Sequence, residues 1–189
     1  MIYNNKAYQK YLDSAVYSYI KEKNLYRKEE RGMDFKEIIH ILQKQRKTIA
    51  TMESCTGGGV VNAITNLKGA CEILRFSAVT YSNEFKIKMG VPKEVIDRYT
   101  VYSMETAKEM SKAITRFAES DFGVGVTGKL KVADPNNPEG DDETVYICLY
   151  DKEHEKFYQE TIKVTEDNRP RNKEQVIHTI IKMLLAILQ

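Results

Sequence analysis

The stretch TIATMESCTGGGVVNAIT, residues 48–65, places a glycine-rich turn between two different secondary-structure patterns. Its β-branched and apolar start, TIATM, predicts a buried strand, and a helix is predicted from Thr56 to about Asn66. Ser54 and Cys55 stand between the two, directly before Thr56 and three consecutive glycines. Glycine permits positive φ and exposes successive backbone N–H groups. The stretch therefore predicts a strand-to-helix turn that carries a hydroxyl and a thiol.

This turn has two possible roles. In the first, its amides and the free N–H groups of the following helix surround a nucleophile and stabilise a developing oxyanion. In the second, the glycines only start a helix, and Ser54 or Thr56 caps it. The spacing alone does not decide between them.

Strands and helices alternate on both sides of the turn. Asp34 and Glu37 resemble a capping box that opens one helix, and Ser103 is expected to cap another whose apolar side includes Ile114 and Phe117. The remaining predicted strands are 75–82, 121–128, 143–151 and 156–164, the last two as a hairpin, and the remaining helices are 83–90, 92–99 and a C-terminal one around 176–188. This order predicts an α/β fold of three layers, α/β/α, with a mixed, mostly parallel sheet.

The segment GVGVTGK, residues 123–129, satisfies two nucleotide-binding patterns in part. Gly123, Gly125 and Gly128 fit G-x-G-x-x-G, and Lys129 completes most of a Walker A motif. Both motifs need a glycine loop that leads into a helix, whereas these glycines lie inside an apparent strand. Leu130 takes the place of the magnesium-binding hydroxyl. Small residues within a strand instead indicate close approach of a helix or a ligand.

Residues 1–32 differ from the rest and are predicted to form an N-terminal helical extension and linker, before a domain at 33–189. Six of the twelve tyrosines are here, and one helix face is apolar: Tyr8, Tyr11 or Leu12, Ala15 and Tyr19. That face either packs on the domain or binds a partner, including a second copy of the chain. A homo-oligomer is expected.

Composition is that of an ordinary soluble globular protein, and the use of cysteine favours a reduced, cytoplasmic one. A net charge of +2, with basic and acidic residues interspersed, gives no reason to expect nucleic-acid binding. No apolar run approaches the length that spans a bilayer, so no membrane association is expected. The three cysteines are too widely spaced to indicate a disulfide framework or a zinc site.

The segment YSNEFK, residues 81–86, supplies polar groups at the end of the strand predicted next along the chain. A serine nucleophile needs a base, and His40, His154 and His178 are all poorly placed for that role. A desolvated lysine can lose its proton and act as the base. We therefore expect Lys86 and Tyr81 to converge with Ser54, although a solvated helix lysine would fit the same pattern.

Four segments together resemble the CinA C-terminal domain family, which includes bacterial nicotinamide mononucleotide deamidases. They are TIATMESCTGGGVVNAIT, AVTYSNEFKIKMGVP, VYSMETAKEMSKAI and DFGVGVTG. The resemblance covers residues 34–189 and leaves the extension unmatched. It implies hydrolysis of the nicotinamide carboxamide to nicotinic acid mononucleotide and ammonia, at the glycine turn, without a metal or other cofactor.

The resemblance also implies the roles of individual residues. Ser54 matches the family serine taken as the nucleophile, and Tyr81 and Lys86 match its Tyr and Lys. The expected pyridine-nucleotide site comprises Glu53, Cys55, Thr56, Gly57, Gly58, Asn83, Thr127 and Gly128.

One segment departs from the family pattern. After the VTG stretch the family continues into a loop of the type TGIAGPGGG, whereas Thr127 and Gly128 are followed here by KLKVADPNNPEGDD, residues 129–142. That loop would help line the substrate site, so its replacement leaves the true substrate open. The alternative to an amidohydrolase is a catalytically inactive member that binds a nucleotide or a protein partner.

Overall fold

The computed structural model describes residues 13–22 and 34–189 and divides the chain into two units, Met1–Met33 and Asp34–Gln189. Within the first unit, helix α2 spans Ser14–Glu22. Tyr8, Tyr11 and Leu12 of the predicted apolar face lie outside the described residues.

The second unit alternates helices and strands as the sequence predicts. Its elements are α3 (Lys36–Gln45), β1 (Ile49–Glu53), α4 (Gly59–Thr65), α5 (Ala70–Ile73), β2 (Leu74–Val79), α6 (Asn83–Lys88), α7 (Lys93–Tyr99), α8 (Met104–Ala118), β3 (Phe122–Gly128), β4 (Thr144–Asp151), β5 (Lys156–Lys163) and α9 (Arg169–Leu188). The hairpin β4–β5 is confirmed. Within the described residues, no helix is long and apolar enough to cross a membrane.

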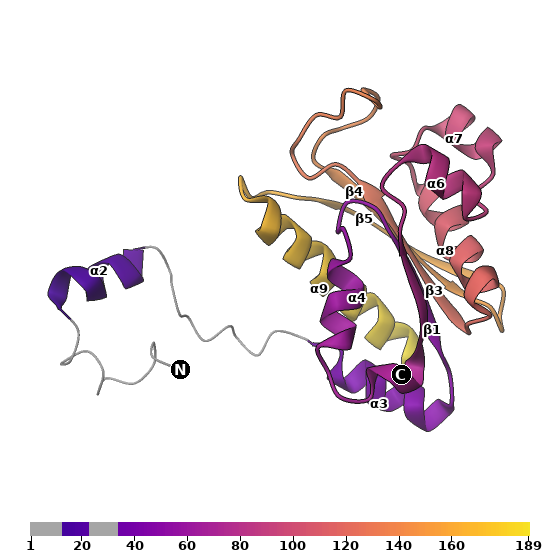
Figure 1. Ribbon diagram of the computed structural model, residues 1–189, viewed down its shortest axis with the longest axis horizontal. Coiled ribbons are helices and arrows are strands. Elements are labelled where there is room, and N and C mark those ends of the chain that lie inside the picture. The colour runs from indigo at the N-terminus through magenta and orange to yellow at the C-terminus, as the bar shows by residue number, and fades with distance from the viewer. Residues whose placement is uncertain (1–12, 23–33) are drawn as a thin grey trace. The chain divides into compact units, whose positions relative to one another are not determined.

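The five strands form one mixed sheet in the order β2-β1-β3-β4-β5. Strand β1 runs parallel to both β2 and β3, and only β4 runs against the direction of the others. Helices α3, α4 and α9 cover one face, and α6, α7 and α8 cover the other (Figure 1). Each face has its own buried apolar cluster. The predicted three-layer α/β/α fold is therefore confirmed.

The glycines of β3 let α8 pack directly on the sheet. A Cβ atom on Gly123 would collide with the carbonyl oxygen of Ser111, and one on Gly125 would collide with that of Ala107. All seven residues of β3 are buried at the middle of the sheet. The GVGVTGK segment therefore serves close helix packing and does not form a phosphate loop.

Three local predictions need correction. Helix α4 begins at Gly59 and not at Thr56, because residues 54–58 form turns and Gly58 adopts a left-handed φ of 89°. Asp34 does not form a capping box with Glu37: its carboxylate accepts a hydrogen bond from the amide of Lys36, in the first turn of α3. Phe117 is 59% exposed and packs against Phe76 of β2, outside the core.

Candidate active site

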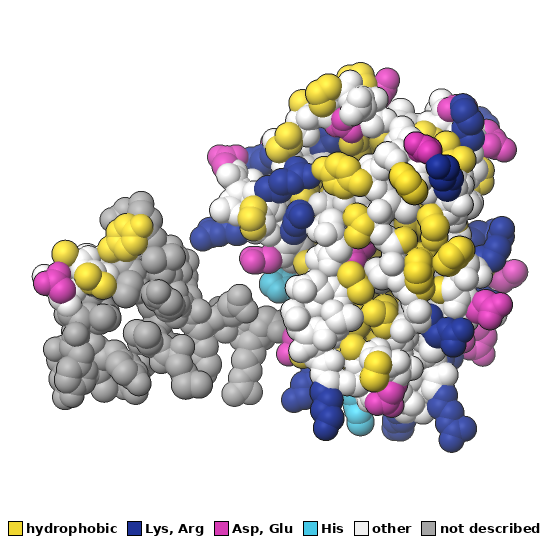
Figure 2. Space-filling model, viewed as in Figure 1, with side chains coloured by type: hydrophobic (Ala, Val, Ile, Leu, Met, Phe, Trp, Pro, Cys, Tyr) yellow, Lys and Arg dark blue, Asp and Glu magenta, His cyan; other side chains and the backbone are white. Residues whose placement is uncertain are grey.

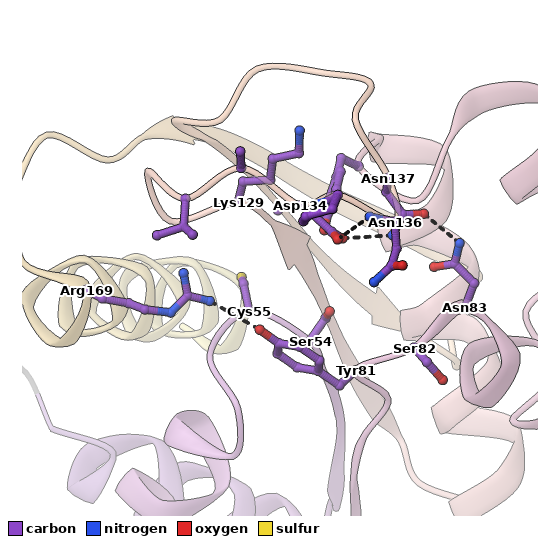
Figure 3. A pocket seen from close by; sticks show the side chains of 15 residues that line it. Ser54, Cys55, Tyr81, Ser82, Asn83, Lys129, Asp134, Asn136, Asn137 and Arg169 are labelled. Carbon is purple, nitrogen blue, oxygen red and sulfur yellow. Dashed lines mark hydrogen bonds between the residues drawn. The ribbon is translucent and has the colours of Figure 1, made fainter.

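A cleft of about 550 Å³ opens at the carboxyl ends of the three parallel strands (Figure 3). Ser54 follows β1, Tyr81 follows β2, and Gly128 ends β3, so the parallel register brings all three to one sheet edge. The cleft is lined by Ser54, Cys55, Tyr81, Ser82, Asn83, Tyr102, Gly128, Lys129, Val132, Ala133, Asp134, Pro135, Asn136, Asn137 and Arg169.

Lys86 reaches Ser54 from helix α6, which follows β2, whereas Ser54 follows the neighbouring strand β1. The Ser82 hydroxyl caps α6 by accepting a hydrogen bond from the Phe85 amide, and one turn of helix then points Lys86 inward. Lys86 Nζ lies 3.2 Å from Ser54 Oγ and donates to the Thr80 carbonyl oxygen at 2.7 Å. The two side chains are 1% and 5% exposed, respectively, so the pair is shielded from bulk water.

The surroundings of Lys86 destabilise its charged form. No carboxylate of the described ranges 13–22 and 34–189 forms an ion pair with it. Burial lowers the pKa of Lys86 from 10.5 to about 8, and the negative charge of Asp134 offsets only part of that effect. A substantial fraction of the amine is therefore unprotonated in mildly alkaline solution and can accept a proton from Ser54.

Cys55 lacks the properties of a reactive thiol. It is 3% exposed, and burial raises the pKa of its thiol to about 12. The thiolate is the nucleophilic form of cysteine, and this environment suppresses it. Of the two adjacent candidates, the structure favours the hydroxyl of Ser54.

Glu53 stabilises the turn through hydrogen bonds to its side chain and does not line the cleft. Its side chain is fully buried, and its carboxylate accepts hydrogen bonds from the amides of Gly58, Val60 and Val61 at 3.1, 3.0 and 2.8 Å. The Thr56 hydroxyl donates to the same carboxylate at 2.7 Å. The expected contact of Glu53 with substrate is therefore replaced by a role at the start of α4.

The amides available to an oxyanion are fewer than the sequence suggests. The Gly57 amide donates to the Ser54 carbonyl oxygen at 3.0 Å, and the Gly58 amide is taken by Glu53. Among the described residues, no acceptor engages the amides of Cys55 and Thr56. These two amides, rather than those of the glycines, are the donors of the turn that remain without an acceptor.

Tyr81 lies at the mouth of the cleft and not against the Ser54–Lys86 pair. Its side chain is 67% exposed, and its hydroxyl accepts a hydrogen bond from the Arg169 guanidinium at 3.5 Å. The expected convergence therefore holds for Lys86 and Ser54 in this structure, and Tyr81 instead pairs with a residue from the start of α9 (Figure 3).

Arg169 lines the cleft but was not predicted from the sequence, because apolar spacing identifies the buried side of the C-terminal helix and not the role of its charged start. No acidic side chain in the part of the chain that the structure describes forms an ion pair with it. Lys173 stands one turn further along α9, with its Nζ beside Gly57. Figure 2 shows several Lys and Arg side chains on the surface where α9 begins. This side of the cleft is therefore suited to an anion.

The other expected site residues divide between the cleft and the core. Asn83 and Gly128 line the cleft, and the Asn83 amide donates to Asn137 at 2.7 Å. Thr127 is fully buried, and its hydroxyl donates to the Val101 carbonyl oxygen at 2.9 Å, which fixes β3 rather than a ligand. No group of three or more metal-binding side chains occurs in the described ranges.

Part of the segment 129–142 forms a wall of the cleft, and Lys131 ties the segment to Asp167, just before α9. Lys129 is 3% exposed and forms an ion pair with Asp142 at 2.8 Å. Asp134 accepts hydrogen bonds from the Tyr102 hydroxyl and the Asn137 side-chain amide. The segment that departs from the family pattern is thus held in place by an ion pair within it and by a hydrogen bond to Tyr102.

Comparison with known proteins identifies relatives of the second unit. A model of the CinA C-terminal domain matches residues 34–188. A protein of Thermoanaerobacter pseudethanolicus named as competence-damage inducible is 35% identical over 159 residues, which cover 82% of this chain and 37% of that protein. A CinA-like protein of Endomicrobium trichonymphae is 33% identical over 153 residues, 77% of this chain and 34% of the relative. The chain spans about a third of the length of these curated relatives.

Solved structures show the same fold. A competence/damage inducible protein from Agrobacterium tumefaciens superposes with a TM-score of 0.72 at 25% identity, over 81% of this chain and 92% of that one. A CinA superfamily protein from Escherichia coli superposes with a TM-score of 0.73 over 89% of this chain and 98% of that one, and at 20% identity it supports the fold alone.

Proposed function

The chain belongs to the CinA C-terminal domain family, and from that premise we propose that it hydrolyses nicotinamide mononucleotide to nicotinic acid mononucleotide and ammonia. The observation that carries the proposal is the buried Ser54–Lys86 pair, 3.2 Å apart at the edge of an open cleft. A hydroxyl beside an amine that can lose its proton is the arrangement needed for acyl transfer from a carboxamide.

In the first half of the reaction, Ser54 Oγ attacks the carboxamide carbon and its proton passes to Lys86 Nζ. The oxygen of the carboxamide becomes an oxyanion, which the free amides of Cys55 and Thr56 are proposed to stabilise. Lys86 then returns its proton to the amide nitrogen as the C–N bond breaks. The products of this half are ammonia and an ester on Ser54.

In the second half, water replaces ammonia as the reacting partner. Lys86 takes a proton from water, the hydroxide oxygen attacks the ester carbon, and a second oxyanion forms at the same two amides. The bond to Ser54 Oγ breaks, and the serine recovers a proton from Lys86. A lysine whose pKa is about 8 suits both halves, because it must accept and release a proton in each.

The rest of the cleft accommodates a nucleotide with its phosphate toward α9. Arg169 and Lys173 supply positive charge there, and Arg169 presents the planar guanidinium that binds phosphate in a bidentate manner. The volume of about 550 Å³ lies within the range typical of small-molecule sites, roughly 300–1,000 Å³.

The direct test is release of ammonia from nicotinamide mononucleotide by the purified full chain, with the acid product identified by chromatography. Ser54→Ala serves as the matched control, because it removes one oxygen from the site. Absence of ammonia release by the unaltered protein would reject the proposal.

A second candidate is a protein that binds a nucleotide without turning it over. It is favoured by one observation: residues 129–142 depart from the family loop and line the cleft. This candidate predicts a ligand-induced rise in melting temperature with no release of ammonia. The same two measurements therefore separate the candidates.

A further inference from the structure

Residues 129–142 present one carboxylate to the cleft, that of Asp134. The Tyr102 hydroxyl and the Asn137 side-chain amide donate to its Oδ2 at 2.5 and 2.8 Å, and the backbone amide of Asn136 donates to Oδ1 at 2.9 Å. A carboxylate has about four lone-pair sites, so these three bonds leave one acceptor position, on Oδ1. Asp134 lines the cleft, which leaves that position within reach of a ligand.

The position of Asp134 is fixed by groups outside its own turn. Tyr102 lies just before α8, and Asn137 is itself held by the Asn83 amide at the start of α6. The Tyr102 and Asn137 hydrogen bonds lower the pKa of Asp134, so the group is an anion at neutral pH. The Asp134 carboxylate is therefore oriented before a ligand binds, and binding carries no entropic cost of ordering this side chain.

Asp134 and Arg169 reach the same cleft from different elements, the loop after β3 and the start of α9 (Figure 3). The lining therefore carries an anion and a cation at separate places, and it also includes Ser54. A mononucleotide whose phosphate lies toward Arg169 and whose carboxamide reaches Ser54 has its sugar between these ends. The hydrogen-bond donors of that sugar are its hydroxyl groups, and a carboxylate is an acceptor-only partner for them.

We propose that Asp134 Oδ1 accepts a hydrogen bond from a ribose hydroxyl of the substrate, and that this contact selects ribonucleotides over deoxyribonucleotides. The inference rests on the proposed function and deepens it, since it assigns sugar recognition to the segment in which this chain departs from its family. Asp134 is in this scheme a specificity-determining residue and takes no part in proton transfer.

The test compares nicotinamide mononucleotide with its 2′-deoxy and 3′-deoxy analogues on the full chain. For the unaltered protein, one of the two analogues should have a KM raised roughly tenfold or more, because a hydrogen bond to a charged group is lost. Asp134→Asn and Asp134→Ala should raise the KM of the ribonucleotide by a similar factor with little change in kcat. Both variants should leave the KM of that deoxy analogue nearly unchanged.

Asp141→Asn is the matched control. Asp141 lies in the same segment, and its carboxylate is held by the Glu143 amide and the Thr144 hydroxyl, but it does not line the cleft. This control should keep the ribose preference of the unaltered protein.

Two outcomes overturn the inference. If the Asp134 variants raise KM equally for the ribonucleotide and both analogues, Asp134 acts through general charge or loop structure and not on a hydroxyl. Equal KM values of the unaltered protein for all three ligands would likewise reject the role of Asp134 in sugar recognition. The proposed function would still hold in that case, provided that ammonia is released. If none of the ligands is bound or hydrolysed, the proposed function fails and the inference fails with it.

Discussion

Lys86 Nζ and Ser54 Oγ lie 3.2 Å apart although 32 positions separate the two residues in the sequence. Strand pairing makes this possible: β1 and β2 are parallel neighbours, so the turn after one and the helix after the other begin at the same edge. The contact joins a weak nucleophile to a buried amine whose pKa is lowered.

Replacement of Ser54 by alanine should lower kcat by roughly a thousandfold or more, because the nucleophile is lost. The fold should be unaffected, as judged by circular dichroism and melting temperature. Cys55→Ala should be milder, since the pKa of about 12 keeps that thiol protonated. If Cys55→Ala lost activity while Ser54→Ala kept it, the nucleophile would be the Cys55 thiol and not the Ser54 hydroxyl.

Replacement of Lys86 by arginine should be nearly as damaging as replacement by alanine. Arginine retains a positive charge but cannot give up its proton at working pH, so it cannot act as a base. The measurement is kcat for both variants beside Lys88→Arg, an exposed lysine on the same helix, as the control. An active Lys86→Arg enzyme would show that Lys86 anchors charge and that the base lies elsewhere.

The pH dependence of both rate and stability should report the pKa of Lys86. Activity requires the neutral amine, so kcat/KM should rise with pH and level off above about 8. For stability, the folded pKa of about 8 lies below the unfolded value of 10.5, so the unfolded chain binds more protons between these values. The protonated lysine therefore costs up to about 3 kcal/mol below pH 8, and this cost disappears as pH rises to about 10.5.

The Lys86→Met variant measures the cost of burying the protonated lysine, because methionine fills similar space without a charge. The variant should be inactive and should melt at a higher temperature than the unaltered protein at pH 7. The difference should shrink between pH 8 and 10.5. A melting temperature that is lower than that of the unaltered protein at pH 7 would show that the hydrogen bond to Thr80 outweighs desolvation.

Replacement of Arg169 by alanine should raise the KM for nicotinamide mononucleotide, with a loss of roughly tenfold or more for a charge-assisted contact. The KM for nicotinamide riboside, which lacks the phosphate, should change little. Arg171→Ala is the control, because Arg171 is paired with Glu166 on the adjoining surface. An equal rise in KM for both substrates would show that Arg169 acts by holding Tyr81 or the cleft wall and does not bind the phosphate.

A chain that begins at Asp34 should fold and retain the site. The second unit contains both apolar clusters and every residue that lines the cleft. Its melting temperature and kcat should match those of the full chain, and any difference should appear in oligomeric state, measured by light scattering. An unfolded product would show that the first unit belongs to the core.

The fold was predictable because hydrophobic periodicity and glycine placement are local signals. The strand predicted at residues 48–52 and the cap at Ser103 are confirmed, and so is the C-terminal helix, although it begins earlier, at Arg169. Phe117 was placed on the apolar side of α8 but is exposed, because periodicity identifies a face of a helix and not how far along the helix that face is covered.

The site was predictable only in part, because several of its contacts join distant segments. Lys86 was recognisable from its motif and from the need for a base. Arg169 carried no comparable signal, since its position depends on where α9 begins relative to the turn. The role of Glu53 was hidden for a related reason: sequence shows a carboxylate next to the nucleophile but not the direction in which it points.

The burial of Glu53 makes formation of the candidate site depend on folding of the turn around it. Its carboxylate is tolerable inside the protein only while the turn and the first residues of α4 supply their donors. If the turn loosened, the Glu53 carboxylate would be buried without its hydrogen-bond donors. Partly ordered forms of the site are therefore disfavoured. The site is therefore all-or-none: destabilised variants should lose activity in proportion to the unfolded fraction, and the molecules that remain folded should work at full rate.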